Sequence, residues 1–180
     1  MGDQLSPFKL LHSIAAKSRQ LAAGLPAQEE IQEYWSGIAF HMAGRQYVAP
    51  IDQVNEILTI PSYTRLPGVQ PWVFGVSNVR GRLVPIVDMA TFFGERSQIP
   101  TRNRRIIVVD HDDMLNGIVV DSVEGMQHFP VDTYSNEVQP DLPESMAPFL
   151  QGHYTRGNRI WSVFSLHGLV TSQGFMQVAS

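Results

Sequence analysis

Short apolar strands separated by turn residues dominate most of the chain. Ile38, Phe40 and Met42 occupy alternate positions, a turn follows at residues 43–44, and an apolar segment returns at residues 46–49. A period of two is that of a half-buried strand, so this stretch predicts a β-hairpin. The same pattern predicts further strands at residues 106–109, 118–120, 123–129 and 160–164. Many short strands with turn residues between them indicate an all-β fold of the barrel type.

The most informative strand pair is predicted at residues 74–88, where two apolar segments flank a tight turn. Gly81 suits the positive φ angle that such a turn needs. Asn78 and Arg80 lie two positions apart, so in a strand both side chains point to the same face. Pro85 predicts an exposed edge or a bulge, and a two-residue turn is expected to place it across from Asn78. The polar side chains of Asn78 and Arg80 on this apolar hairpin have no catalytic partner nearby in the sequence. This favours a surface that recognises another protein.

Apolar spacing also predicts three short helical segments between the strands. In residues 51–58, Val54 lies on the apolar side of the expected helical turn and Glu56 on its polar side. Brief helices are also expected at residues 88–93 and 166–170. No long internal repeat is visible in the sequence.

Residues 1–34 differ in composition and spacing from the rest of the chain. Ser6 and Pro7 suit a helix N-cap and the first helical position, and apolar residues then recur with roughly helical spacing. A helix of that length is marginal alone, so we expect an extension that docks on the folded domain, the alternative being a loosely ordered leader. The domain itself is expected to span residues 35–175.

Composition limits the classes of protein that the chain can belong to. It has 180 residues, 43% of them hydrophobic, which supports one globular unit or two small lobes. The formal net charge of -4 gives no global attraction for nucleic acid or an anionic membrane. There is no cysteine, no apolar run of the roughly 20 residues that a membrane span needs, and no secretory signal at the first residues. We therefore expect a cytoplasmic protein.

Candidate catalytic and metal-binding groups are few. Residues 110–113 (Asp-His-Asp-Asp) have metal-ligand chemistry, but they lie between two predicted strands, where aspartate is expected as a turn former. Residues 101–105 are basic but lack the interleaved aromatic residues of a nucleic-acid site. We therefore expect no enzymatic activity, no metal and no cofactor. A hydrolase that uses residues 110–113 and a small β-barrel that binds nucleic acid or a small ligand are the alternatives.

A spaced motif in this region resembles a known family. Its positions are Gly75, Val76, Asn78, Arg80, Gly81, Pro85, Ile86 and Asp88. Before it come Val54, Glu56 and Ile57, and after it come the apolar segments 105–109 and 117–123, the second of which contains Asp121. The order and spacing of these residues resemble the CheW-like domain, the adaptor fold of bacterial chemosensory arrays.

The resemblance implies two small five-stranded SH3-like β-barrels packed on each other, with short helices. It also implies an adaptor that links the cytoplasmic helical tip of a methyl-accepting chemoreceptor to the regulatory domain of a CheA-type histidine kinase, and that meets the membrane only through the receptor. In the family, the positions matching Val54, Glu56, Ile57 and Arg80 lie at or near the contact surfaces. Asn78 joins this candidate protein-binding set because it shares a predicted face with Arg80.

The remaining motif residues are assigned to turns and to the structure: Gly75, Gly81, Pro85, Asp88 and Asp121. Arg80 itself has two compatible roles, since it can pair with Asp88 or Glu56 and can also offer its planar donors to a partner. Ser165 departs from the acidic or amide residue that many relatives carry before the last helix. Within the family, the extension and residues 34–38 and 125–132 are most similar to the adaptors of type IV pilus (twitching motility) pathways.

Overall fold

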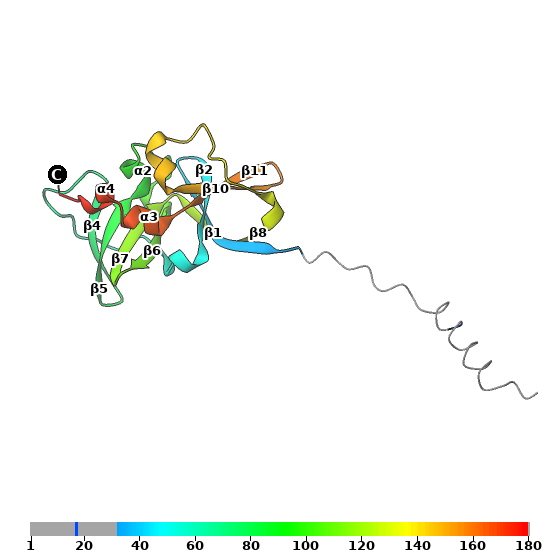
Figure 1. The fold of residues 1–180 in the computed structure, drawn as a ribbon. Coiled ribbons are helices and arrows are strands. Elements are labelled where there is room, and N and C mark those ends of the chain that lie inside the picture. The colour runs from blue at the N-terminus through cyan, green and yellow to red at the C-terminus, as the bar shows by residue number, and fades with distance from the viewer. Residues whose placement is uncertain (1–16, 18–31, 180) are drawn as a thin grey trace, which may run out of the picture. The chain divides into compact units, whose positions relative to one another are not determined.

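The computed structural model describes Lys17 and residues 32–179 (Figure 1). The helical extension predicted for residues 1–34 falls almost entirely outside the described residues. From Glu33 onward the chain forms one compact unit. None of the helices in the described part of the chain has the length and apolar character that a membrane crossing requires.

This unit is built mainly of short strands, so the prediction of an all-β fold is confirmed. The strands are β1 (Tyr34–Met42), β2 (Arg45–Pro50), β3 (Glu56–Thr59), β4 (Val73–Val79), β5 (Arg82–Asp88), β6 (Arg105–His111), β7 (Met114–Val120), β8 (Ser122–Pro130), β9 (Tyr134–Ser135), β10 (Leu150–Arg156) and β11 (Arg159–Phe164). The short helices are η1 (Ile51–Gln53), α2 (Met89–Phe92), η2 (Thr101–Asn103), η3 (Val131–Thr133), η4 (Glu144–Phe149), α3 (Leu166–Val170) and α4 (Gln173–Met176).

The strands form two sheets that exchange segments. One has the order β8-β1-β2-β11-β10-β9 and the other β3-β6-β7-β5-β4. The β1–β2 hairpin belongs to the six-stranded sheet, but β3, which follows it, pairs with β6 in the five-stranded sheet. In the same way β8, which follows the β6–β7 hairpin, pairs with β1. Each sheet therefore combines a hairpin from one half of the chain with strands from the other half, and neither half completes a sheet alone.

The two halves of the chain repeat one connectivity, although no long repeat is visible in the sequence. Each half contains a hairpin, a strand that crosses to the other sheet, a second hairpin and a short helix. The parallel contacts are equivalent, since β5 pairs with β7 and β11 pairs with β2. The helix caps are equivalent too, with the side chain of Asp88 capping α2 and that of Ser165 capping α3. The duplication is thus a property of the fold that side-chain divergence conceals.

Each sheet closes into a barrel through a returning segment and a glycine. In the five-stranded sheet, Thr64 pairs with Val76 of β4 through two backbone hydrogen bonds of 2.8 and 2.9 Å. In the other sheet, the chain leaving β8 forms η3 and then β9, which pairs with β10. Gly75 has φ 145° and Gly152 has φ 120°, and a Cβ at either position would overlap the carbonyl oxygen of the returning segment. The expected pair of five-stranded barrels is confirmed, with β9 as an additional two-residue strand.

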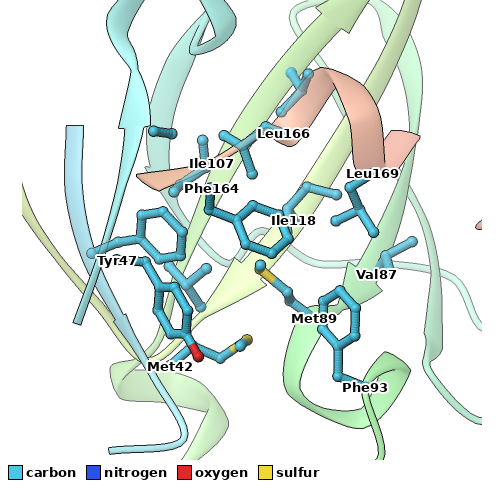
Figure 2. Packing of buried hydrophobic residues seen from close by; sticks show 14 of the residues in the cluster. Met42, Tyr47, Val87, Met89, Phe93, Ile107, Ile118, Phe164, Leu166 and Leu169 are labelled. Atoms are coloured by element: carbon cyan, nitrogen blue, oxygen red, sulfur yellow. The ribbon is translucent and has the colours of Figure 1, made fainter. Parts of the chain in front are cut away.

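The largest hydrophobic core lies where the two sheets and the short helices meet. Figure 2 shows Tyr47 and Phe164 from one sheet beside Ile107 and Ile118 from the other. Met42, Val87, Met89, Phe93, Leu166 and Leu169 complete the labelled part of this cluster. The Tyr47 hydroxyl donates to Sδ of Met146 at 3.4 Å, and burial raises the pKa of Tyr47 to about 12. Because the core joins both sheets, burial of apolar surface holds the two barrels to each other.

Three details differ from the prediction made from the sequence. Residues 51–58 form η1 and then β3 instead of one helical turn, because pairing with β6 holds Glu56 in an extended conformation. The loop predicted at residues 110–117 is reduced to a two-residue turn at Asp112 and Asp113, whose φ angles are 50° and 62°. Strand β10 is missed by the pattern, since its polar residues and its glycine hide the alternation.

Barrel closure predicts that Gly75→Ala is strongly destabilising. The added Cβ must displace the backbone of the returning segment, so we expect a loss of at least about 2 kcal/mol in the free energy of unfolding, measured by urea denaturation. Gly157→Ala is the matched control, because Gly157 has φ 61° but no atom within 4 Å of the added Cβ. It should cost about 1 kcal/mol. Equal losses in the two variants would contradict this account of closure.

Candidate functional site

The candidate site is built around the tip of the β4–β5 hairpin. Val79 pairs with Arg82, and the two residues between them have φ angles of 51° (Arg80) and 83° (Gly81). The N–H of Gly81 donates to Oδ1 of Asn78 at 2.8 Å, so the asparagine side chain is used within the turn. This is an Asx-type bond, the ordinary way in which asparagine stabilises a tight turn. Arg80 therefore belongs to the turn, in a φ region that only a few per cent of non-glycine residues adopt, and the prediction that it shares a strand face with Asn78 is wrong.

The register of this hairpin corrects one prediction. Asn78 lies across from Leu83, and Pro85 lies across from Val76, two pairs further from the turn than expected. The turn does have two residues, but counting outward from it puts Pro85 opposite Val76. Pro85 also lies directly before Ile86, where β5 begins to pair with β7. The missing N–H of the proline is thus accommodated at a stretch that has a strand on one side only.

An ion pair joins the hairpin tip to β3. Nη2 of Arg80 lies 2.8 Å from Oε2 of Glu56. The arginine side chain is 79% exposed and the glutamate side chain only 18%. Within the described residues, Oε2 of Glu56 is buried and has no well-aligned hydrogen-bond donor, so this contact is electrostatic. The pairing brings together the two segments that the sequence marks as candidate contact residues.

Val54 and Ile57, the other two candidate residues near β3, do not have the positions that a helical turn would give them. Ile57 is 37% exposed and, in a strand, points to the face opposite Glu56. Val54 is half-buried and packs against the main core. Asp52 and Glu56 therefore do not share a helix face, as a helical turn at residues 51–58 would require. The exposed part of the site consists of Arg80, the rim of Glu56 and the aliphatic side chain of Ile57.

The free energy expected of this ion pair shows how much it can stabilise the fold. An ion pair with one largely exposed partner contributes about 0–1 kcal/mol to stability. The free energy that Arg80 adds to the fold is therefore small. The pair also restrains an exposed guanidinium, and a restrained side chain has less entropy to lose in any contact that it makes.

Asp88, the other candidate partner of Arg80, is bound elsewhere. Arg104 donates from Nη1 and Nη2 to the two carboxylate oxygens of Asp88, at 3.1 and 2.7 Å. Nε of Arg104 lies 3.4 Å from Oδ1 of Asp121, without hydrogen-bond alignment. Asp121 also accepts from the N–H of Ala43 at 2.8 Å and from the hydroxyl of Ser97. All three charged side chains are nearly fully buried.

This buried cluster holds the end of β5 and the junction between β7 and β8 together. Asp88 ends β5 and accepts hydrogen bonds from the N–H of Ala90 and the hydroxyl of Thr91, so it caps α2. Asp121 lies between β7 and β8, where the chain crosses from one sheet to the other. The structure places the predicted structural residues Asp88 and Asp121 on one arginine that sequence analysis assigned to an exposed basic loop. The available signal was that both aspartates end apolar strands.

The inward position of Arg104 weakens the nucleic-acid alternative. Of the basic residues in this loop, Arg104 is buried, and Arg105 donates to the carbonyl groups of residues 103 and 104. Arg96 and Arg102 remain exposed. Two separate arginines do not form the continuous positive groove that single-stranded nucleic acid requires.

The structure also gives the aspartate-histidine segment a structural setting. Asp112 and Asp113 form the β6–β7 turn, and the ring of His111 lies against that of His167 with 4.8 Å between centroids. In the part of the chain that the structure describes, no three histidine or acidic side chains gather as metal ligands would.

Burial raises the pKa of Tyr154, with a smaller contribution from Tyr134, but both rings belong to an aromatic cluster with Trp35.

Comparison with known proteins agrees with this architecture. Residues 36–174 match the family model described as the CheW-like domain. The chain is 50% identical to the protein PilI of Pseudomonas aeruginosa over 179 residues, 99% of each chain. It is 30% identical to the chemotaxis protein CheW of Helicobacter pylori over 111 residues, 62% of this chain and 67% of that one. A crystal structure of the scaffolding protein TtCheW from Thermoanaerobacter tengcongensis has a TM-score of 0.67 and 23% identity, covering 79% of this chain and 96% of that one.

The chain is therefore a protein of two interlocked β-barrels with an arginine at the tip of one hairpin. The chain belongs to the CheW-like domain family. The family resemblance predicted from the hairpin motif is confirmed, and the branch singled out by residues 34–38 and 125–132 is that of PilI.

The buried charge cluster predicts a large effect of Arg104→Met. Removing the guanidinium leaves two buried carboxylates without their cation, so we expect a loss of about 3–5 kcal/mol in the free energy of unfolding. Thermal and urea unfolding measure it. Arg102→Met, two residues away and exposed, should change stability by less than about 0.5 kcal/mol. A loss at Arg104 as small as that at Arg102 would show that the cluster does not hold the crossover.

Proposed function

We propose that this protein is a chemosensory adaptor without enzymatic activity, coupling a methyl-accepting receptor to a CheA-type histidine kinase. We further propose that the protein acts in the cytoplasm and that its pathway controls twitching motility driven by type IV pili. The adaptor meets the membrane only through the receptor. Its partners are the receptor's cytoplasmic helical tip and the regulatory domain of the kinase.

Family membership and the relatives support this proposal. Full-length identity of 50% to PilI makes a shared role the simplest expectation, and the CheW relatives are chemotaxis proteins by name. The TtCheW structure is described as that of a scaffolding protein. A scaffold needs exposed contact surfaces on a rigid body, and the two interlocked barrels supply such a body.

The observation that carries the proposal is the Arg80–Glu56 pair at the hairpin tip. It places one largely exposed guanidinium beside a half-buried carboxylate of β3, the strand that also exposes Ile57 on its other face. Charged and aliphatic side chains together are usual constituents of a small protein-binding hot spot. The protein-binding residues proposed are Val54, Glu56, Ile57, Asn78 and Arg80, with Asn78 and Val54 acting through the positions of the other three.

Regulation by such an adaptor is a matter of differential contacts. The receptor changes the active population of the kinase only if the adaptor binds differently in the two signalling states. A coupling free energy of about 1–3 kcal/mol, or roughly 5- to 150-fold in affinity, is typical. A single interfacial arginine can supply an effect of that size.

We predict that Arg80→Ala and Glu56→Arg weaken assembly of the ternary complex at least about tenfold while the fold is retained, since a modest hot spot contributes about 1.4 kcal/mol. The measurement is co-sedimentation and calorimetry with a receptor cytoplasmic fragment and the kinase from the same organism. Arg102→Ala is the matched control, because it removes an exposed arginine outside the candidate site.

Full receptor and kinase binding by both site variants would reject the site assignment. The alternative class is tested with the same protein and a single-stranded oligonucleotide. Binding to the oligonucleotide that is lost in Arg102→Ala, together with no binding to the kinase, would favour a nucleic-acid module.

A further inference from the structure

Strands β5 and β7 diverge to form a fork on the surface of the five-stranded barrel (Figure 1). Their parallel pairing begins at Ile86 opposite Gly117 and continues for three residue pairs. Residues before these positions, Arg82, Leu83 and Pro85 on one side and residues 113–116 on the other, line an open pocket between the strands. Leu83 in this fork is 71% exposed and Met114 is 47% exposed. Two large apolar side chains thus face solvent at one place.

The internal duplication supplies an equivalent fork in the six-stranded barrel, between β2 and β11. There the parallel pairing begins at Tyr47 opposite Ser162, and Arg45 and Ile160 line the corresponding pocket. This second fork is partly covered by the chain itself, because Gln139 and Leu142 line it as well.

The covering segment is held in two ways. Leu142 packs against the main hydrophobic core. The guanidinium of Arg45 donates from Nη2 to the carbonyl oxygen of Asp141 at 3.1 Å, and its Nε lies 4.0 Å from the Asp141 carboxylate. A leucine in the wall of the fork and an acidic residue on its rim therefore partly cover this site in one barrel. The β5–β7 fork is the equivalent site without such a cover.

The rims of the two forks differ in charge. In the covered fork the rim arginines are Arg45 and Arg159, and the covering segment is acidic at Asp141. In the open fork the rim carries two carboxylates against one guanidinium. These groups are Asp110, Asp113 and Arg82, with Arg82 donating to Oδ2 of Asp110 at 3.2 Å and to the carbonyl of Asp113 at 2.6 Å. The open rim is thus acidic, and a complementary segment is basic.

The register of β5 adds main-chain groups to the fork. Val76 uses its own N–H and C=O on Thr64, so the Val76–Pro85 pair and, two residues on, the Asn78–Leu83 pair do not exchange hydrogen bonds. The N–H and C=O of Leu83 therefore point toward the fork. An extended segment can add to a strand edge that presents such groups.

We propose that the β5–β7 fork is a docking site for an extended segment of a partner protein, carrying an aliphatic side chain next to a lysine or arginine. The aliphatic side chain takes the place that Leu142 has in the other barrel, and the cation meets the acidic rim. The inference goes beyond the adaptor function, because it does not depend on which signalling partner supplies the segment.

The test uses two end-capped hexapeptides based on residues 138–143. One has the chain's own sequence, Val-Gln-Pro-Asp-Leu-Pro, and in the other arginine replaces the aspartate. We expect the arginine peptide to shift the backbone NMR signals of Leu83 and Met114 in the full chain. It should bind at least about fivefold more tightly than the aspartate peptide, which is the worth of a charge contact of about 1 kcal/mol at an exposed site.

Two variants locate the binding. Leu83→Asp changes an exposed residue and should abolish binding of the arginine peptide, whereas Ile160→Asp, the matched change at the covered fork, should leave it intact. Equal affinity for both peptides, or no response at Leu83, would overturn the proposal. Self-association of the unliganded protein in sedimentation that Leu83→Asp abolishes would also overturn it, because the occupant would then be a second copy.

Discussion

Closure of two barrels from exchanged strands is the constraint on which the rest of this structure depends. Strand β3 leaves the hairpin of one sheet and completes the other, and this brings Glu56 to the β4–β5 tip. The same crossover on the other side runs through Asp121, which Arg104 holds together with Asp88. A contact patch made from residues 56, 57 and 80 therefore exists only when the five-stranded barrel, which takes strands from both halves of the chain, is formed. This couples the integrity of the fold directly to the presentation of the candidate site.

Two arginines differ in how much they contribute to stability and in how far they are exposed. Arg104 is buried between two carboxylates, where removing one partner leaves uncompensated charge at a cost of several kcal/mol. Arg80 is exposed and paired with one carboxylate, an interaction worth about 1 kcal/mol at most to the fold. Of the two, Arg80 contributes less to stability and is the one that remains exposed. That is the arrangement expected of a binding anchor and the opposite of what a structural ion pair requires.

Sequence alone predicts the first three hairpins, the all-β class and the family, because these depend on local alternation, turn residues and a spaced motif. It does not predict that Arg104 turns inward, since its partners Asp88 and Asp121 are brought to it by tertiary structure and its neighbours are polar. It places residues 51–58 in a helical turn, because the partner strand that extends Glu56 lies far along the chain. The duplication is hidden for a similar reason: bulge glycines and caps persist, while the side chains around them have diverged.

The central proposal is that Glu56 positions the exposed side chain of Arg80 for contact with a partner. Exchanging the two charges tests it most directly, by comparing Arg80→Glu, Glu56→Arg and the double variant for unfolding free energy and for assembly with receptor fragment and kinase. The account predicts that the double variant regains the stability of the unmodified protein, since the ion pair is restored, but not its ternary assembly. Recovery of assembly together with stability would contradict the account and reduce the pair to a structural contact.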